Sequence, residues 1–94
     1  MAMKVFLVDD SLIIRQRLTR FLFNLGQVQI IGESAEAHDA IDRILKLRPD
    51  VVILDLQLLN GTGFDVLESI KKDKPAPTVI ILTNFPYPEY RKKC

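Results

Sequence analysis

Aspartates close two of the most apolar stretches in this chain. Residues 51–54 run directly into Asp55, and residues 4–8 run directly into Asp9 and Asp10. If these stretches are neighbouring strands of a parallel sheet, their ends lie about 4.8 Å apart and the three carboxylates converge at one edge. A hard divalent cation relieves the repulsion among them, and Mg²⁺ prefers one or two carboxylates, a carbonyl oxygen and retained waters. The pattern therefore predicts a magnesium site.

A hydroxyl group is predicted at the same edge. Residues 78–82 form a further apolar run, which ends at Thr83. If this strand lies on the other side of the strand that ends in Asp55, Thr83 joins the carboxylates. A metal ion and a hydroxyl can stabilise charge on the equatorial oxygens of a phosphoryl group while Asp55 attacks in line. The predicted chemistry is transfer of a phosphoryl group to a carboxylate.

Strands and helices are predicted to alternate along the chain. Apolar runs without polar alternation are typical of strands buried on both faces, and apolar residues at three- and four-residue spacing indicate helices. The predicted strands are residues 4–8, 28–32, 51–55 and 78–82, and the predicted helices are residues 11–25, 34–48 and 64–74. Right-handed crossovers then place helices on both faces of the sheet. The fold class is a doubly wound, parallel α/β sheet.

Each predicted helix has an apolar face and a capping signal. Gly26 is expected to end the first helix, Ser34 to cap the second, and Thr62 with Asp65 to form a capping box at the third. The side chains expected to point inward are Ile14, Leu18, Phe21, Leu22, Leu25, Ala37, Ala40, Ile41, Ile44, Leu45, Phe64, Leu67 and Ile70, and those expected on the solvent side of the first helix are Arg15, Arg17 and Arg20.

The composition allows one domain, spanning residues 1–94. The hydrophobic fraction is 48%, ample for a folded core, and 13 basic against 12 acidic residues give a formal net charge of +1. This balance gives no sign of a nucleic-acid or membrane partner. A single cysteine, Cys94, fits a reducing compartment, and neither a signal peptide nor an apolar run of membrane-spanning length is recognised. The expectation is a soluble, cytoplasmic protein.

Four motifs together resemble the receiver domain of response regulators. They are Asp9-Asp10-Ser11 after the first strand, Asp55-Leu56 at the end of the third, Gly63 eight residues after Asp55, and Thr83 at the end of the fourth. The resemblance covers the whole chain and implies a flavodoxin-like sheet with strand order 2-1-3-4. It also implies a signalling module and not an enzyme.

The resemblance implies a role for each site residue. Asp55 would accept the phosphoryl group from a phosphohistidine on a sensor histidine kinase or a phosphotransfer protein. Asp10 would bind Mg²⁺ directly and Asp9 through water, and Asp55 and the backbone carbonyl of Gln57 would complete the protein's share. Thr83 would be the switch hydroxyl that moves toward the phosphoryl group.

The chain departs from the family pattern at several places. Leu58-Leu59 stands where such domains usually carry Met-Pro, and Asn84 follows Thr83 where a smaller residue is usual. A receiver continues with the rest of a fourth helix, a fifth strand that begins with a Lys, and a fifth helix, whereas this sequence stops at Cys94, within the fourth helix. Because that Lys would pair with the phosphoryl oxygens, phosphorylation is expected to be weak.

The missing elements are expected to leave apolar surface uncovered, along residues 79–82 and on one side of the first helix. Each large apolar side chain left in water forfeits roughly 1.5–3 kcal/mol, against a domain stability of about 5–15 kcal/mol. We therefore expect a homo-oligomer, or a partner that covers the open edge.

Two other functions are compatible with the sequence. A phosphatase of the haloacid dehalogenase type also ends its first strand in a nucleophilic Asp, but it requires a second Asp two residues later, where this chain has Ser11. The other is a scaffold fragment that assembles without being phosphorylated. Treatment with acetyl phosphate and Mg²⁺ separates the three: a stable mass gain, turnover of phosphate esters, or no response.

Overall fold

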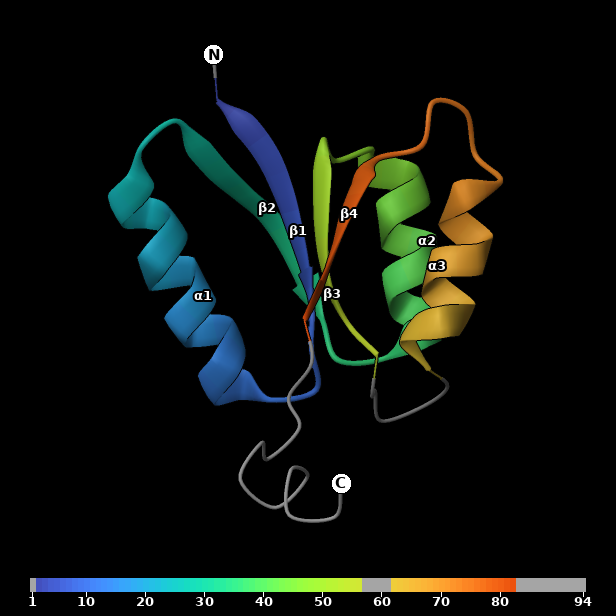
Figure 1. Ribbon diagram of the computed structural model, residues 1–94, viewed down its shortest axis with the longest axis horizontal. Helices are drawn as coiled ribbons and strands as arrows, with labels where there is room; N and C mark the ends of the chain where they lie inside the picture. Colours follow the sequence, from blue (N-terminus) through green and yellow to red (C-terminus); the bar gives the residue numbers. More distant parts are fainter. Residues whose placement is uncertain (1, 57–61, 83–94) are drawn as a thin grey trace, which may run out of the picture.

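Strands and helices alternate along the chain as predicted. The computed structural model describes residues 2–56 and 62–82, and the structural findings concern these residues. The strands are β1 (Met3–Val8), β2 (Val28–Ser34), β3 (Val51–Asp55) and β4 (Thr78–Leu82), and the helices are α1 (Leu12–Leu25), α2 (Ala37–Leu47) and α3 (Gly63–Lys71) (Figure 1). No helix in this part of the chain is long and apolar enough to cross a membrane.

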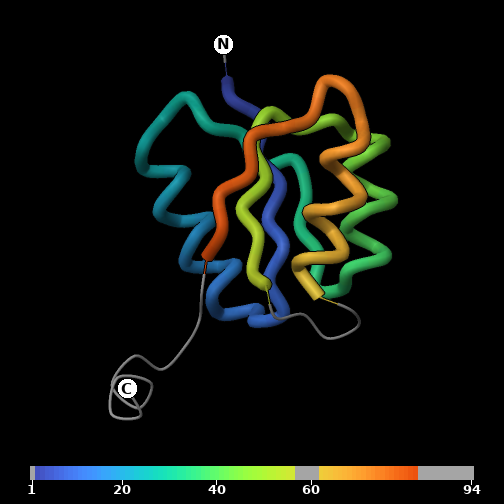
Figure 2. The backbone as a smooth tube through the Cα atoms, turned by 45° about the vertical axis from the view of Figure 1, so that its right-hand side comes forward, coloured from blue at the N-terminus to red at the C-terminus, as the bar shows by residue number. Residues whose placement is uncertain are grey.

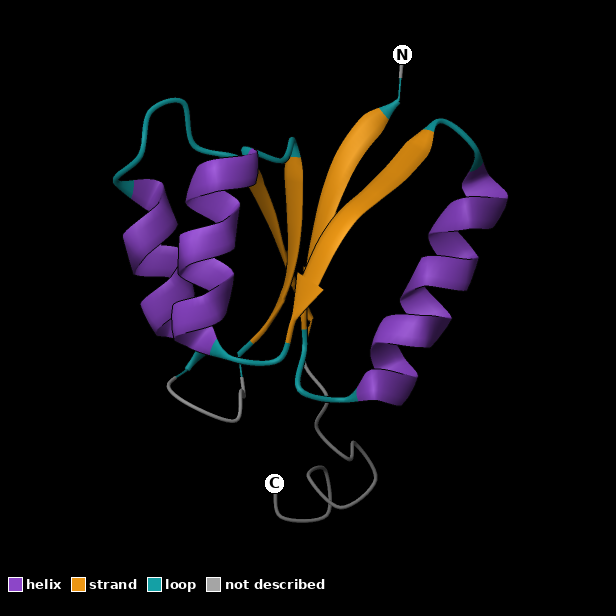
Figure 3. Ribbon diagram, turned by 180° about the vertical axis from the view of Figure 1, so that it is seen from behind, coloured by secondary structure: helices purple, strands orange, loops and turns teal. Residues whose placement is uncertain are grey.

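The four strands form one parallel sheet in the order β2-β1-β3-β4. This confirms the predicted flavodoxin-like strand order. Helix α1 covers one face of the sheet, and α2 and α3 cover the other (Figure 3), as right-handed crossovers require. The carboxyl ends of all four strands therefore lie along one edge of the sheet, the lower edge in Figure 1.

Two apolar cores lie on the two faces of the sheet. Strands β1 and β3 send alternate side chains into both cores, which explains why their sequences are apolar without interruption. The core beneath α2 and α3 contains Phe6, Val8, Ala37, Ala40, Ile44, Val52, Leu54, Val66 and Ile70, and the core beneath α1 contains Val5, Leu7, Leu22 and Ile53.

Asp50 fixes the register between β1 and its neighbour β3 at the amino end of the sheet. Its Oδ2 accepts a hydrogen bond of 2.8 Å from the Lys4 backbone N–H, and its own N–H donates to the Lys4 carbonyl at 2.8 Å. Its carbonyl accepts from the N–H of Thr78 at 3.1 Å, which ties in β4. Figure 2 shows β1 and β3 running side by side. The same register continues to the other end of the strands, where Val8 lies opposite Leu54. The residues that follow this pair, at the carboxyl edge, are therefore level with each other.

Four of the side chains expected in the cores are exposed instead. Phe21 and Leu25 are each 60% exposed, Phe64 is 62% exposed and Leu45 is 38% exposed. In α1 the side that faces the sheet is centred on Leu18 and Leu22, and Phe21 and Leu25 lie beside it. In α2 the predicted stripe holds apart from Leu45, with Ala37, Ala40 and Ile44 buried. In α3 the stripe is shifted, because Val66, and not the predicted Phe64, is buried in the core.

The predicted end of α1 and the predicted capping box of α3 are confirmed. Gly26 ends α1 with a φ of 72° that glycine adopts readily. Ser11, expected within the helix, is its N-cap and accepts from the Ile14 N–H at 3.3 Å. At α3, Thr62 and Asp65 form the predicted reciprocal capping box. Helix α3 ends at Lys71, three residues earlier than predicted.

The predicted cap of α2 is wrong. Ser34 is the last residue of β2, and the N-cap is Glu36, whose side chain makes no capping bond. Strand β2 is two residues longer than predicted because Glu33 and Ser34 continue the pairing with β1. The Ser34 hydroxyl still organises the start of α2: it accepts from the Glu36 N–H at 3.2 Å and donates to Asp39 Oδ2 at 2.6 Å.

Strand β4 is an edge strand of the described sheet, as the sequence predicts. Ile80 is 48% exposed and Ile81 is 41% exposed, on opposite faces of the strand. Apolar residues of α1 are also exposed, namely Leu12, Ile13, Phe21, Phe23 and Leu25. Exposed apolar surface thus lies on both faces of β4 and on α1.

Candidate functional site

The structure brings Asp9, Asp10 and Asp55 together at the carboxyl edge of the sheet. One carboxylate oxygen of each residue lies within 4.8 Å of those of the other two. The convergence follows from the register of the two strands. Asp9 directly follows β1, Asp55 is the last residue of β3, and the two strands pair at Val8 and Leu54. The predicted spatial arrangement of the three carboxylates is confirmed.

The three carboxylates differ in exposure. Asp9 is 1% exposed and Asp55 is 2% exposed, whereas Asp10 is on the surface. Burial of a carboxylate is costly unless hydrogen bonds or a cation compensate it. Asp9 is compensated in part by the Ser11 N–H, which donates to its Oδ1 at 2.8 Å. This bond closes a tight turn between β1 and α1, so that Asp9 also has a structural role.

The arrangement fits a magnesium ion. Mg²⁺ binds oxygen ligands at 2.0–2.1 Å, so two ligands on opposite sides of the ion are about 4.2 Å apart. Oxygens spread over as much as 4.8 Å suit a site in which one carboxylate binds through a retained water.

Gly63 lies against the backbone of Asp55 and Leu56. Its N–H donates to the Leu56 carbonyl at 2.9 Å, which returns the chain to the end of β3. A Cβ at this position would collide with the carbonyl group of Asp55 and would lie 2.5 Å from the Cα of Leu56. The sequence marks Gly63 only as part of a motif. The structure gives the physical reason for it, which is the close approach of two backbones.

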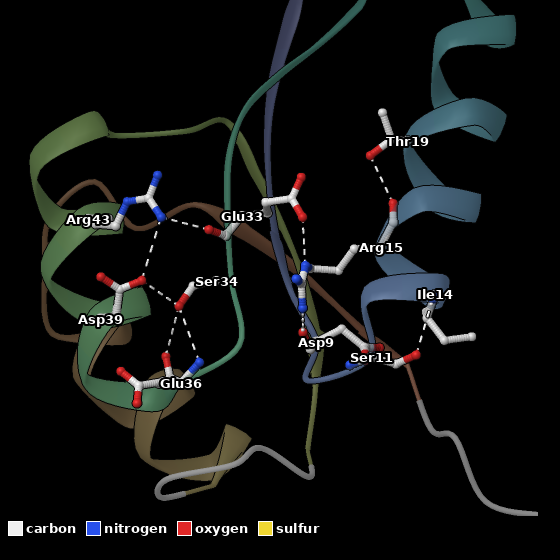
Figure 4. A network of polar contacts seen from close by, with 10 residues as sticks. All are labelled: Asp9, Ser11, Ile14, Arg15, Thr19, Glu33, Ser34, Glu36, Asp39 and Arg43. Carbon is white, nitrogen blue, oxygen red and sulfur yellow. Dashed lines mark hydrogen bonds and ion pairs between the residues drawn. The ribbon is translucent and has the colours of Figure 1, made fainter.

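Arg15 belongs to the surroundings of the site, and its expected position on the solvent side of α1 is wrong. Its side chain is 14% exposed. Its Nη1 donates to the backbone carbonyl of Asp9 at 2.6 Å, and its Nε forms an ion pair of 2.6 Å with Glu33 at the end of β2 (Figure 4). The signal in the sequence is weak: Arg15 lies one helical turn after the cap Ser11, on the side of α1 that looks back at the turn after β1.

Gln57 and Thr83, with Leu58, Leu59 and Asn84, lie outside the described residues. The described neighbour of Thr83 is Leu82, which is in register with Asp55. The roles expected for Gln57 and Thr83 therefore stay predictions.

The sequence matches a known family over nearly its full length. The family model described as "Response regulator receiver domain" matches residues 5–94. Among curated relatives, the sensory transduction protein LytT of Bacillus cereus is 36% identical over 83 residues, which cover 88% of this chain and 34% of LytT. The chain thus spans about a third of the length of this relative.

Solved structures agree with the match. The response regulator domain of CheB from Thermotoga maritima has a TM-score of 0.82 and 26% identity, over 88% of this chain and 61% of that one. RcsB from Salmonella enterica serovar Typhimurium, bound to a promoter in the presence of the phosphomimetic BeF₃⁻, has a TM-score of 0.79 and 28% identity, over 88% of this chain and 43% of that one. A further structure holds two RcsB dimers on two parallel DNAs.

Proposed function

The chain belongs to the response-regulator receiver family of two-component phosphorelay signalling, and on that premise we propose that Asp55 accepts a phosphoryl group with the help of Mg²⁺. The observation that carries this proposal is the convergence of Asp9, Asp10 and Asp55 within 4.8 Å of one another. Asp55 ends the central strand β3, which pairs with β1 as far as Leu54 and with β4 at Asp55 itself. A nucleophile on a rigid strand end is well suited to in-line attack.

Each acidic residue has its own part in this proposal. Asp10 is exposed and binds the metal directly, while the buried Asp9, already bonded to the Ser11 N–H, binds it through water. The backbone carbonyl of Gln57 is a further ligand, and the Thr83 hydroxyl contacts the phosphoryl group. These two assignments rest on the family motifs alone.

The reaction exchanges one bond to phosphorus for another. A carboxylate oxygen of Asp55 forms a new P–O bond, the P–N bond of a phosphohistidine breaks, and its electron pair returns to the imidazole nitrogen. Bound Mg²⁺ supplies positive charge that offsets the charge on the phosphoryl oxygens. The donor is a sensor histidine kinase or a phosphotransfer protein, and the chain acts as an acceptor without turning over substrates of its own. A cytoplasmic location, in keeping with the single cysteine, is part of this proposal.

Assembly is a second function that a specific observation favours. Ile80 and Ile81 on β4, and several large apolar side chains on α1, are exposed, and an uncovered edge strand is a template for pairing. We propose that a second copy or a partner covers this surface. Dimers in the RcsB structure support association in a relative. The weak phosphorylation expected from the sequence stays a prediction.

Incubation with acetyl phosphate and Mg²⁺, followed by intact-mass measurement, tests the proposed function. The expected result is a gain of one phosphoryl group that disappears in Asp55→Asn and without Mg²⁺. Asp73→Asn is the matched control, because Asp73 pairs with Arg48, away from the three carboxylates, and it should be phosphorylated normally. No mass gain would favour the scaffold alternative, and continued release of phosphate from several esters would favour the phosphatase alternative.

A further inference from the structure

We propose that Arg15 and Glu33 form a clamp that positions the metal-binding carboxylates, and that the clamp sets the affinity of the site for Mg²⁺. The inference rests on the proposed function, because it assumes that Asp9 and Asp10 take part in metal binding. Arg15 acts through the main chain of Asp9, so it is a positioning residue and not a catalytic one.

The clamp joins three elements at the edge of the sheet (Figure 4). Arg15 extends from α1, donates through Nη1 to the carbonyl of Asp9 after β1, and pairs through Nε with Glu33 in β2, both at 2.6 Å. Both contacts are charge-assisted and short, which is the strong class of hydrogen bond. The planar guanidinium makes them at once, and this couples the position of the Asp9 carbonyl to the end of β2.

The bond to the Asp9 carbonyl bears on Asp10. The carbonyl of Asp9 and the N–H of Asp10 belong to one planar peptide unit. A donor that fixes the carbonyl therefore fixes the direction in which the Asp10 backbone continues. Since Asp10 is exposed, packing contributes little to the direction of its side chain. We expect the orientation of this peptide to decide where the Asp10 carboxylate meets a metal.

Other bonds hold the remaining groups of Asp9. Its N–H donates to the Ser34 carbonyl at 3.0 Å, and its Oδ1 accepts from the Ser11 N–H at 2.8 Å. Together with Arg15, these bonds fix the amide, the carbonyl and the carboxylate of one residue. Glu33 is held in turn, because Arg43 donates to its backbone carbonyl at 2.6 Å. The clamp is thus anchored to α2 as well.

Arg15 is expected to affect metal affinity in two opposite ways: its bond to the Asp9 carbonyl raises the affinity by positioning, and its positive charge lowers it. The positive charge of Arg15 lies close to the site and by itself disfavours a cation, while Glu33 offsets that charge. The Glu33 side chain is 42% exposed, so its ion pair alone contributes little to stability. A variant that removes both charges leaves the local net charge unchanged, and its effect on Mg²⁺ binding therefore reports positioning.

The test compares Mg²⁺ dissociation constants of the 94-residue chain, measured by titration with MgCl₂ followed by backbone amide shifts. The double variant Arg15→Gln/Glu33→Gln should bind Mg²⁺ about tenfold more weakly than the wild type, the lower end of the range for outer-shell partners of metal ligands. The ratio of the two constants should not change between low and high salt, since screening acts on charge and not on geometry. The matched control is Arg48→Gln/Asp73→Asn, which removes an ion pair of 3.1 Å that does not contact the carboxylates, and its affinity should equal that of the wild type.

Two further measurements separate positioning from loss of fold. The rate of phosphorylation by acetyl phosphate at saturating Mg²⁺ should be close to the wild-type rate in the double variant, while the Mg²⁺ concentration for half the maximal rate rises about tenfold. If the double variant does not fold without metal, Arg15→Lys serves as the test of the clamp. Lysine keeps the positive charge but lacks the planar guanidinium that contacts the Asp9 carbonyl and Glu33 at the same time. Its affinity should lie between those of the wild type and the tenfold-weaker limit.

The two proposals fail in distinguishable ways. A wild-type chain without saturable Mg²⁺ binding would overturn the proposed function and this inference with it. A wild-type chain that binds Mg²⁺, with unchanged affinity in the folded double variant or in Arg15→Lys, would overturn the clamp alone. A loss of affinity that vanishes at high salt would assign the effect to charge and would also overturn the clamp.

Discussion

At the scale of single residues, the site depends on two buried carboxylates and on one glycine that lies against the chain beside them. Asp9 and Asp55 are almost fully buried although each carries a carboxylate, and a structure retains such groups where they serve a purpose beyond stability. Gly63 is the least replaceable of their neighbours, because a Cβ there has no space beside the Asp55 carbonyl. Asp9, Asp10, Asp55 and Gly63 are recognisable in the sequence. Arg15 is not, since an arginine on an amphipathic helix is most often solvated and only the fold turns it toward the Asp9 carbonyl.

Replacement of Gly63 should damage both the fold and the site. Gly63→Ala is expected to destabilise the chain by about 1–3 kcal/mol, the usual cost of overpacking, and to weaken Mg²⁺ binding because the end of β3 must move. Urea unfolding and Mg²⁺ titration measure the two effects. Gly26→Ala is the control: its φ of 72° makes it destabilising as well, but the space around it is open and α1 ends there, so Mg²⁺ affinity should not change. Equal Mg²⁺ affinity in both variants would contradict the role of Gly63.

At the scale of elements, the sequence predicts the order of strands and helices well, and it predicts less well which face of each helix is buried. Runs such as Val51–Asp55 and the glycine at the end of α1 identify strand and helix positions, and the strand order follows from the receiver resemblance. Helix faces were less predictable because several large apolar side chains, such as Phe21 and Phe64, lie beside the buried stripe. The end of β2 was missed because Glu33 and Ser34 are polar, and only their pairing with β1 makes them a strand.

The capping box at α3 offers a test at this scale. Thr62→Ala removes the hydroxyl that accepts from the Asp65 N–H at 3.3 Å, and it should lower the free energy of unfolding by about 1 kcal/mol. Urea unfolding monitored by circular dichroism measures the loss. Ser69→Ala, within the same helix, should be neutral or slightly stabilising because alanine has the higher helix propensity. A similar loss in both variants would show that Thr62 contributes nothing through capping.

At the scale of the whole molecule, the described fold leaves apolar surface uncovered on β4 and on α1, among other places. Strand β4 exposes Ile80 and Ile81, and α1 exposes Phe21 and Phe23. Full burial of such a side chain from full exposure is worth roughly 1.5–3 kcal/mol, and these four are between 41% and 78% exposed. Each would gain the corresponding part of that free energy, which favours association of two chains or of this chain with a partner.

A charge placed on the exposed edge should therefore reduce association. The wild-type chain is expected to sediment as a concentration-dependent oligomer at micromolar concentration, and Ile80→Lys should shift it toward the monomer. Gln29→Lys adds the same charge to β2, at the opposite edge of the sheet, and should leave the oligomer intact. A stable, monomeric wild-type chain would contradict the proposed assembly, and dissociation by Gln29→Lys alone would assign it to the other edge.

The proposed function depends most directly on a shared magnesium site, and an amide-resolved Mg²⁺ titration of the wild-type chain tests whether the three carboxylates form one. We predict saturable shifts at Asp9, Asp10 and Asp55, and their loss in Asp10→Asn, because the three carboxylates lie within 4.8 Å of one another. Shifts confined to other parts of the chain, or wild-type shifts that persist in Asp10→Asn, would contradict it.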